Sequence, residues 1–501
     1  MRSNTRKSIV GIVLLSLFAA SCEQYFEPTT AIDETSALSN ASDVATVTIG
    51  NYAFLKNANY TTSGHILMEY PSDEIAQGQI SSNDLTRAYR YTHINTSAHA
   101  TNYWAECYKT IAAANKVIGF VPDDASAELR QLKGENIFLR AMIHFNLVRI
   151  FGRPYNQNNA SNPGIPILTD LLSESEVDNI KRSTVKEVYD SIIADLLRAA
   201  ELMSERKPGI YASKEVAYAL LSKVYLFKED NENALKYADL VISSGRYSLI
   251  PSANLPNYFR STPENNAETI FAVRHTNVQI AGISTMYISS DVSLNPKAQG
   301  VSGWAELYAS RKYWDFIRQH PEDLRLSFIT PYQINGVLQY NGKLDPPTPM
   351  YYINKFTLQE GVINAASPVY LRLADIYLIR AEANAKMGNA EAALQDVNLI
   401  RSRAGLSGNA LYSTGSVSAA GKTILDVVLE ERFLELAFEG HRVYDLFRNG
   451  RPMERNYPGT HSQNNTPTTN VYQKVEPTDP RVVFYIPQAE IDRNSNLTQN
   501  P

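Results

Sequence analysis

The stretch YLRLADIYLIRAEANAKMGNAEAALQDVNLIRSRAG, from Tyr370 to Gly405, decides the fold of this chain. Apolar or small residues recur at offsets of 0, 3, 4, 7, 8, 11 and 15, which is one face of an α-helix: Tyr370, Leu373, Ala374, Tyr377, Leu378, Ala381 and Ala385. Leu371, Ile376 and Ile379 make the opposite face apolar, so we expect neighbours on both sides. Gly388 interrupts the pattern, and a second helix follows. A helix–turn–helix of about 34 residues with small alanines is typical of a tetratricopeptide-type unit.

The same helical pattern recurs elsewhere in the chain. It predicts helices over residues 44–55, 101–120, 128–151, 184–203, 214–228 and 232–243. Ala234-Leu235 opens the second helix of one pair as Ala393-Leu394 opens that of another, which is an approximate internal repeat. We therefore predict an all-α fold built on tetratricopeptide-type helix pairs.

A second block, LEERFLELAFEGHRVYDLFRNG (429–450), follows after residues 406–428. Glu431, Glu435 and Glu439 are spaced by four and would repel one another on a helix. We expect the arginines at 432, 442 and 448 to offset them, and we interpret the block as structural rather than catalytic.

Together these two blocks resemble the C-terminal part of the SusD/RagB family, the lipid-anchored nutrient-binding proteins of the outer membrane in Bacteroidetes-type bacteria. Further segments match in the family's order: 108–118, 134–154 (GENIFLRAMIHFNLVRIFGRP), 183–203, 213–247 and the closing FYIPQAEIDRNSNLTQNP. Arg493-Asn-Ser495 departs from the family's usual Asn-Pro, which affects only a local turn. The resemblance implies a SusD-like N-terminal part (43–260) and a RagB/SusD C-terminal part (261–501) in one compact body.

The N-terminus has the features of a bacterial lipoprotein signal. Basic residues at 2, 6 and 7 precede an apolar run at 9–20 that is too short to span a bilayer, and Ala19-Ala20-Ser21 leads into Cys22. We predict a signal peptide over 1–21, lipidation at Cys22 and a tether over 22–42, with the protein held at the outer membrane and facing the cell exterior. The alternative is an ordinary cleaved signal with a coincidental cysteine.

Composition narrows the range of functions. The 501 residues are 44% hydrophobic and 20% charged, which is ordinary for a soluble globular protein. The formal net charge is −5, and removing the signal takes away three positive charges, leaving about −8. A moderately acidic body disfavours nucleic-acid binding, which usually needs a basic patch.

Two long irregular regions, between residues 66–102 and 276–368, interrupt the helices and are rich in tyrosine, asparagine and glycine. We expect them to meet and form one aromatic-lined site, because aromatic faces stack on sugars while polar side chains bind hydroxyl groups. The candidate ligand contacts are Asp73, Arg87, Tyr89, Tyr91, His93 and Asn95, followed by Tyr287, Trp304, Tyr308 and Tyr313. Trp304 and Tyr308 would share a helical face if a helix begins there. We assign Trp104 and Trp314 to the core.

No catalytic motif is present: the sequence lacks HExxH, GxSxG and GxxxxGK[ST]. Two cysteines and eight scattered histidines make a metal site improbable, and nothing indicates a cofactor. Carboxylate pairs at Asp73/Glu74 and Glu430/Glu431 are the only hint of glycosidase chemistry. We interpret the second pair as ion pairs, whereas the first lies where it can hydrogen-bond a ligand.

We therefore predict a non-enzymatic lipoprotein that binds oligosaccharides for import. The resemblance implies a partner, a SusC-like TonB-dependent outer-membrane transporter that receives the ligand. A peptide ligand, as in the RagB branch, is the first alternative. A surface glycoside hydrolase and a purely structural scaffold are the others.

Overall fold

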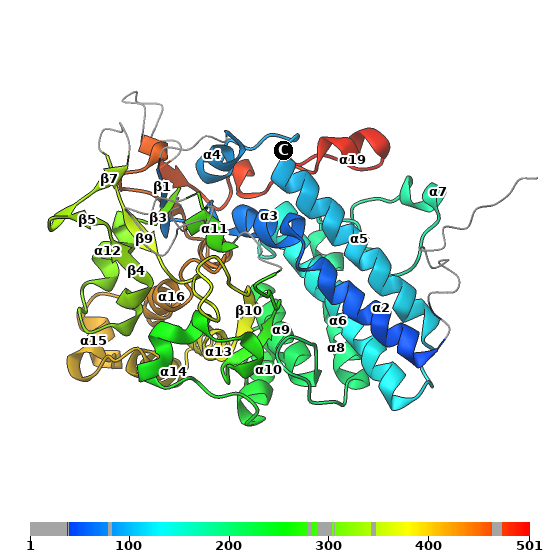
Figure 1. Cartoon of the computed structure of the whole chain (residues 1–501), viewed down its shortest axis with the longest axis horizontal. Helices are drawn as coiled ribbons and strands as arrows, with labels where there is room; N and C mark the ends of the chain where they lie inside the picture. Colours follow the sequence, from blue (N-terminus) through cyan, green and yellow to red (C-terminus); the bar gives the residue numbers. More distant parts are fainter. Residues whose placement is uncertain are drawn as a thin grey trace, which may run out of the picture.

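A ladder of antiparallel helices forms the body of the molecule in this computed structural model. The structure describes residues 38, 40–78, 83–278, 283–287, 303, 304, 306–341, 347–462 and 473–501. The long helices are α2 (Ala41–Phe54), α3 (Ala58–Glu69), α5 (Ala98–Phe120), α6 (Ala127–Phe151), α8 (Val185–Leu202), α9 (Lys214–Phe227), α10 (Asn231–Ser243), α13 (Leu373–Lys386), α14 (Ala390–Arg403) and α16 (Ile424–Glu435). From α5 onward each packs against the next in this order, so the array crosses the molecule from right to left in Figure 1.

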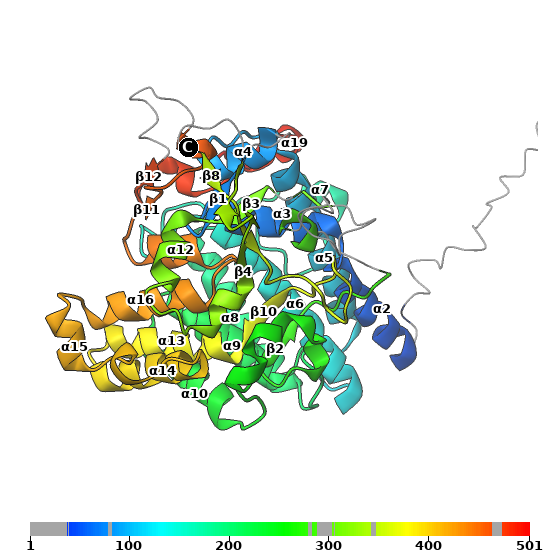
Figure 2. The ribbon, with the colours of Figure 1, turned by 60° about the vertical axis from the view of Figure 1, so that its left-hand side comes forward.

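The pair that decides the fold lies at one end of this array. α13 contacts α9, α10, α14 and α16, so it is covered on both faces as its sequence predicted. Figure 2 shows α16, α13, α14 and α10 lying one beside another. Gly388 adopts a φ of +83° in the turn between α13 and α14, a conformation that glycine adopts without strain. The predicted helices agree with those observed to within about three residues at each end.

Short strands lie over the helices, mainly in the two irregular regions. A four-stranded antiparallel sheet has the order β1 (Ile75–Gln77), β3 (Leu307–Ala309), β9 (Tyr351–Ile353) and β4 (Ile329–Pro331). The two-stranded pairs are β2 (Thr269–Ala272) with β10 (Val369–Arg372), β5 (Gln333–Ile334) with β6 (Val337–Leu338), β7 (Tyr340–Asn341) with β8 (Thr348–Pro349), and β11 (Met453–Glu454) with β12 (Lys474–Val475).

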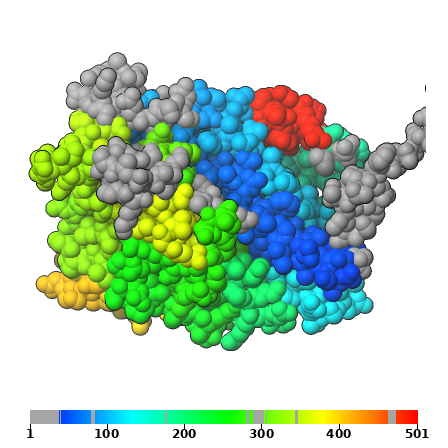
Figure 3. All heavy atoms as spheres, viewed as in Figure 1, coloured from blue at the N-terminus to red at the C-terminus, as the bar shows by residue number. Residues whose placement is uncertain are grey.

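Short helices complete the described chain. They are α4 (Asn83–Arg90), α7 (Glu174–Val177), α11 (Ile283–Tyr287), α12 (Arg311–Ile317), α15 (Thr414–Ala419), α17 (Arg442–Arg448) and α19 (Gln488–Arg493), with 3₁₀ turns that include η1 (Ser252–Arg260), η4 (Leu324–Phe328) and η6 (Thr460–Ser462). In the space-filling view α19 lies on the surface at the upper right, and the hairpin β5–β6 projects at the left edge (Figure 3).

Both parts of the chain contribute to one core. The largest hydrophobic cluster extends from Tyr52 to Ile486, and Phe138 and Phe271 meet within it with ring centroids 5.2 Å apart. Within the described residues, no helix is long and apolar enough to cross a membrane. The predicted signal peptide and Cys22 lie outside the residues that the structure describes.

Two local predictions were wrong. Residues 304–310 do not begin a helix, because Tyr308 pairs with Ala76 and Tyr352 in the sheet and α12 starts only at Arg311. The block 429–450 is not one continuous helix either. α16 ends at Glu435, and α17 begins at Arg442 after a turn in which Phe438 has a φ of +67° and Gly440 a φ of +73°.

Candidate functional site

The early and middle irregular regions meet in the four-stranded sheet, as predicted. Strand β1 of the early region pairs with β3 of the middle region through Ile75 opposite Ala309 and Gln77 opposite Leu307. Ser310 extends the contact: its Oγ donates to the backbone oxygen of Asp73 at 2.8 Å and its backbone nitrogen donates to that of Glu74 at 2.7 Å. Segments more than 200 residues apart in sequence therefore lie side by side in one sheet at this end of the molecule (Figure 1).

Asp73 stabilises the contact between the early and middle regions, and its side chain does not face a ligand. Its side chain is 1% exposed and accepts hydrogen bonds from Arg442 Nε at 2.7 Å and from Lys312 Nζ at 2.5 Å. Burial opposes ionisation, but these two cations hold the pKa of Asp73 well below its usual value. Our assignment of Asp73 as a ligand contact was wrong, because its carboxylate is already saturated by Arg442 and Lys312.

The five candidate tyrosines are buried and cannot stack on a ligand. Each is at most 2% exposed: Tyr89, Tyr91, Tyr287, Tyr308 and Tyr313. Their hydroxyl groups hydrogen-bond inside the protein, for example Tyr91 Oη to the backbone oxygen of Pro71 at 2.8 Å and Tyr313 Oη to that of Leu434 at 3.2 Å. A tyrosine can be buried in the core when its hydroxyl group has a hydrogen-bond partner inside the protein. The hydroxyl groups of all five tyrosines have such a partner.

His93 and Asn95 secure the C-terminal segment. His93 Nε2 donates to the backbone oxygen of Arg481 at 3.0 Å, and its ring lies 4.0 Å from that of Phe484. Asn95 Nδ2 donates to Gln488 Oε1 at 2.5 Å. Both side chains therefore bind the C-terminal segment of the protein rather than a ligand. Arg87 is 39% exposed and pairs with Asp84 at 3.4 Å, so its guanidinium remains accessible.

Trp304 is the predicted aromatic that the structure leaves at the surface. Its side chain is 40% exposed, and its backbone nitrogen donates to the oxygen of Thr285 at 2.6 Å, beside the sheet. Trp104, by contrast, is 3% exposed and packs against Phe151, as expected for a core residue. Trp314 is half-buried and stacks on Tyr351 at 4.7 Å.

Our sequence reasoning missed an exposed apolar hairpin beside this junction. Ile334 and Val337 pair across the β5–β6 turn and are 49% and 64% exposed, and Tyr340 on β7 is 49% exposed. The sequence contains the pattern that predicts this hairpin, because Asn-Gly between alternating apolar residues is the usual sequence of a two-residue hairpin turn. In the structure Asn335 and Gly336 both adopt a positive φ, as such a turn requires. The middle irregular region thus carries exposed aromatic and apolar side chains, among them Trp304, Ile334, Val337 and Tyr340.

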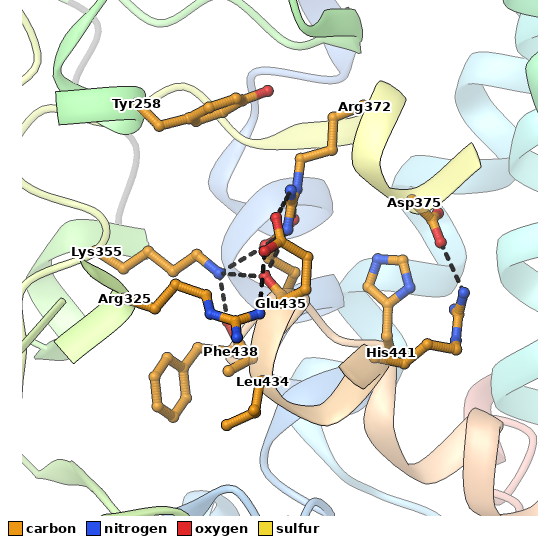
Figure 4. Close-up of polar contacts among 12 residues, drawn as sticks. Tyr258, Arg325, Lys355, Arg372, Asp375, Leu434, Glu435, Phe438 and His441 are labelled. Carbon is orange, nitrogen blue, oxygen red and sulfur yellow. Dashed lines mark hydrogen bonds and ion pairs between the residues drawn. The ribbon is translucent and has the colours of Figure 1, made fainter. Parts of the chain in front are cut away.

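The charged row of the second block, Glu431, Glu435 and Glu439, lies inside a buried ion network. In the part of the chain that the structure describes, five basic side chains face five carboxylates, each at most 5% exposed: Arg325, Lys355, Arg372, Arg401 and Arg403 with Glu268, Asp323, Glu431, Glu435 and Glu439. Figure 4 shows Glu435 between Arg325, Lys355 and Arg372. The arrangement is structural, because no member reaches the surface.

The partners that we expected for these glutamates were wrong. Arg432 pairs with Asp445 at 2.7 Å and with Asp375 at 3.1 Å, and Arg448 pairs with Glu382 and Asp445. Arg442 pairs with Asp73. The three arginines of the block therefore connect α16 and α17 to other elements, while the glutamates are neutralised by cations from outside the block.

Glu74 and its neighbour Glu69 hold the turn between α16 and α17. Glu69 Oε2 accepts from the backbone nitrogen of Gly440 at 2.8 Å, and Glu74 Oε2 accepts from that of Phe438 at 2.8 Å. Burial raises the pKa of Glu69 to about 7, and burial together with the nearby Glu69 raises the pKa of Glu74 well above its usual value. Glu74 is 1% exposed, so our interpretation of it as a ligand contact was wrong.

The cavities differ in what they can hold. Two internal spaces of about 40 and 50 Å³, the first lined by Tyr91 and His93 among others, have room for a few water molecules only. A cleft of about 210 Å³ lies between α5 and the C-terminal segment, and a groove of about 300 Å³ lies between α12, α16 and α17. Of these four, only the two larger spaces approach the size of small-molecule sites.

Comparison with known proteins assigns the chain to a family. One family model, described as the SusD family, matches residues 333–501, and another, described as starch-binding and associating with the outer membrane, matches residues 24–226. SusD-like protein P2 of Formosa agariphila is 24% identical over 523 residues, covering 99% of both chains. A SusD superfamily protein from Bacteroides thetaiotaomicron superposes with a TM-score of 0.80 at 26% identity, covering 92% of this chain and 100% of the other.

The chain belongs to the SusD/RagB family. A structure titled laminarin binding SusD-like protein shares the fold, with a TM-score of 0.69 and 22% identity over 93% of this chain and 100% of the other. The SusD/RagB resemblance and the predominantly helical fold that we predicted from the sequence are thus confirmed.

Proposed function

We propose that this SusD/RagB-family protein captures oligosaccharides at the cell surface and delivers them to a SusC-like TonB-dependent transporter in the outer membrane. The observation that carries the proposal is the exposed ring of Trp304 beside the sheet that joins the early and middle regions. An exposed indole offers a flat apolar face for the C–H surface of a sugar. Arg87, Tyr340 and the apolar side chains of the β5–β6 hairpin are further accessible side chains of the two irregular regions.

The comparisons support this proposal at the level of the family. The model matching residues 24–226 is described as starch-binding and as associating with the outer membrane, and one structural relative is titled as laminarin binding. A lipid on Cys22 would hold the protein at that membrane, with the following residues as a tether. A tethered binding protein without its own route across the membrane needs a transporter to receive its ligand.

Peptides are the alternative ligand, because an exposed tryptophan, Trp304, and an accessible arginine, Arg87, also suit peptide side chains and carboxylates. Hydrolysis fits the structure less well. Asp426 and Glu430 are one helical turn apart and face the same groove, as a glycosidase pair must. Asp426 already pairs with Arg451 at 2.6 Å and Glu430 with Lys422 at 2.8 Å, so both carboxylates of the groove are held in ion pairs.

Calorimetry on the protein without residues 1–22 tests the proposal against panels of oligosaccharides and peptides. Trp304→Ala should weaken binding at least tenfold, equivalent to about 1.4 kcal/mol. The unfolding midpoint should not change, because the ring is 40% exposed. Phe120→Ala is the matched control, since Phe120 is 43% exposed at the end of α5. Equal losses in both variants, or no loss in Trp304→Ala, would contradict the site, and binding of peptides alone would establish the alternative.

A further inference from the structure

The groove between α12, α16 and α17 has an apolar floor. Phe316 comes from α12, Leu429 and Phe433 from α16, and Leu446 from α17. Phe316 and Phe433 meet with ring centroids 5.7 Å apart, which closes the floor between the two helices. Figure 2 shows α12 and α16 side by side. The volume of about 300 Å³ is at the lower end of small-molecule sites, so the groove fits one unit of an oligomer.

The rim of the groove carries more positive than negative charge. Among the described residues that line it, four are basic, Lys312, Lys422, Arg442 and Arg451, and two are acidic, Asp426 and Glu430. Asp73 lies behind the wall and neutralises part of the charge of Lys312 and Arg442. Even with Asp73 included, four cations face three carboxylates, and this excess favours an anionic occupant.

The two ion pairs at the rim of the groove are partly exposed, so a ligand can replace one partner of each pair. Lys422 and Glu430 pair at 2.8 Å with side chains 36% and 27% exposed, and Arg451 and Asp426 pair at 2.6 Å with 34% and 29% exposed. Such half-exposed pairs contribute little to stability, so a ligand carboxylate can replace the protein's own at small cost. Asp426 remains held by the backbone nitrogen and hydroxyl of Thr423 when its arginine turns to a ligand.

We propose that this groove is a second binding site, one that does not include Trp304, and that it takes a uronic-acid unit. The apolar floor meets the C–H face of the sugar ring, Lys422 and Arg451 meet its carboxylate, and Asp426 and Glu430 accept its hydroxyl groups. A neutral sugar would leave the excess of positive charge unused. An aliphatic acid would offer the two carboxylates of the rim no hydroxyl groups.

Calorimetry with digalacturonate as the probe and galactobiose as its neutral counterpart tests the assignment. The double variant Lys422→Gln/Arg451→Gln removes two cations from the rim. The matched control Lys186→Gln/Arg198→Gln removes two cations from exposed ion pairs on α8, where the side chains are 51% and 35% exposed. An N-acetylated dipeptide with a free carboxylate is the third ligand, and Trp304→Ala is the variant that addresses the other site.

Digalacturonate should bind at least tenfold more tightly than galactobiose, and the rim variant should weaken it about tenfold while the control variant does not. Equal binding of galactobiose, or equal losses in rim variant and control, would overturn the proposal. Dipeptide binding as tight as that of digalacturonate would assign the groove to peptide carboxylates instead. If Trp304→Ala alone abolished digalacturonate binding, the groove would be excluded while the proposed function stood.

Discussion

Replacing Glu435 by alanine removes the carboxylate at the centre of the buried ion network. The side chain of Glu435 is 2% exposed and contacts Arg372, Arg403 and Arg325, the last at 3.3 Å. Without it, five buried cations face four carboxylates. These arginines hold the pKa of Glu435 well below its usual value, although burial opposes ionisation. The folded state thus depends on this charge above the ordinary pKa of a glutamate.

The expected loss follows from the contacts that remain. Breaking a buried ion pair by removing one partner typically costs about 3–5 kcal/mol of unfolding free energy. Arg372 keeps Glu439, Arg325 keeps Asp323 and Arg403 keeps Glu268, so no cation is left without a carboxylate. We therefore expect a loss near the lower end, about 3 kcal/mol.

Urea unfolding followed by circular dichroism measures this loss, and ligand titration on the same samples shows whether binding changes. Glu430→Ala is the matched control on the same helix, because Glu430 is 27% exposed and pairs only with Lys422 among the partners that the structure describes; its loss should stay below about 1 kcal/mol. A collapse of ligand affinity in Glu435→Ala with an unchanged unfolding midpoint would refute the structural role. A loss no larger than that of the control would refute the magnitude.

Two further predictions concern the anchor and the pH response. Cys22→Ala should release the mature protein from membranes in fractionation, and continued sedimentation with outer membranes in a strain without the transporter would contradict the lipid anchor. The pKa of Glu69 is raised by burial to about 7, above the ordinary 4.5, so its contribution to stability is lost as pH rises from about 4.5 to 7. Glu69→Gln should therefore reduce the loss of unfolding free energy between pH 5 and 8 by up to about 3 kcal/mol, and an unchanged pH profile would contradict the assignment.

The helical body could be predicted because its signal is local. The 3.6-residue period of apolar side chains in α13 is a property of neighbouring residues, and its double-sided pattern already implied helices on both faces. The sheet was not predictable in this way. Its strands are three residues long, and β3 pairs with β1 across more than 200 residues and with β9 across more than 40. Nothing in the immediate sequence therefore distinguishes Tyr308 in a strand from Tyr308 in a helix.

The candidate site was predictable only by region. Both irregular segments are rich in tyrosine, but tyrosine occurs equally well in cores and on surfaces. Whether Tyr89 or Tyr287 is buried depends on hydrogen-bond partners that lie far away in the sequence, His461 and His65 respectively. The two segments do meet, through β1 and β3, but the five candidate tyrosines are buried and do not line a site.

The charged row shows why local spacing misled us about partners. The rule that residues four apart interact applies to the exposed side of a helix, where no other element competes. Glu435 points into the protein, and its partners Arg403, Arg372 and Arg325 lie 32, 63 and 110 residues away on three other elements. A buried carboxylate takes whichever cations the fold brings to it, because an unpaired charge there is too costly. The row of glutamates therefore predicted that buried cations exist, while their identity was determined only by the packing of β10, α14 and η4 around α16.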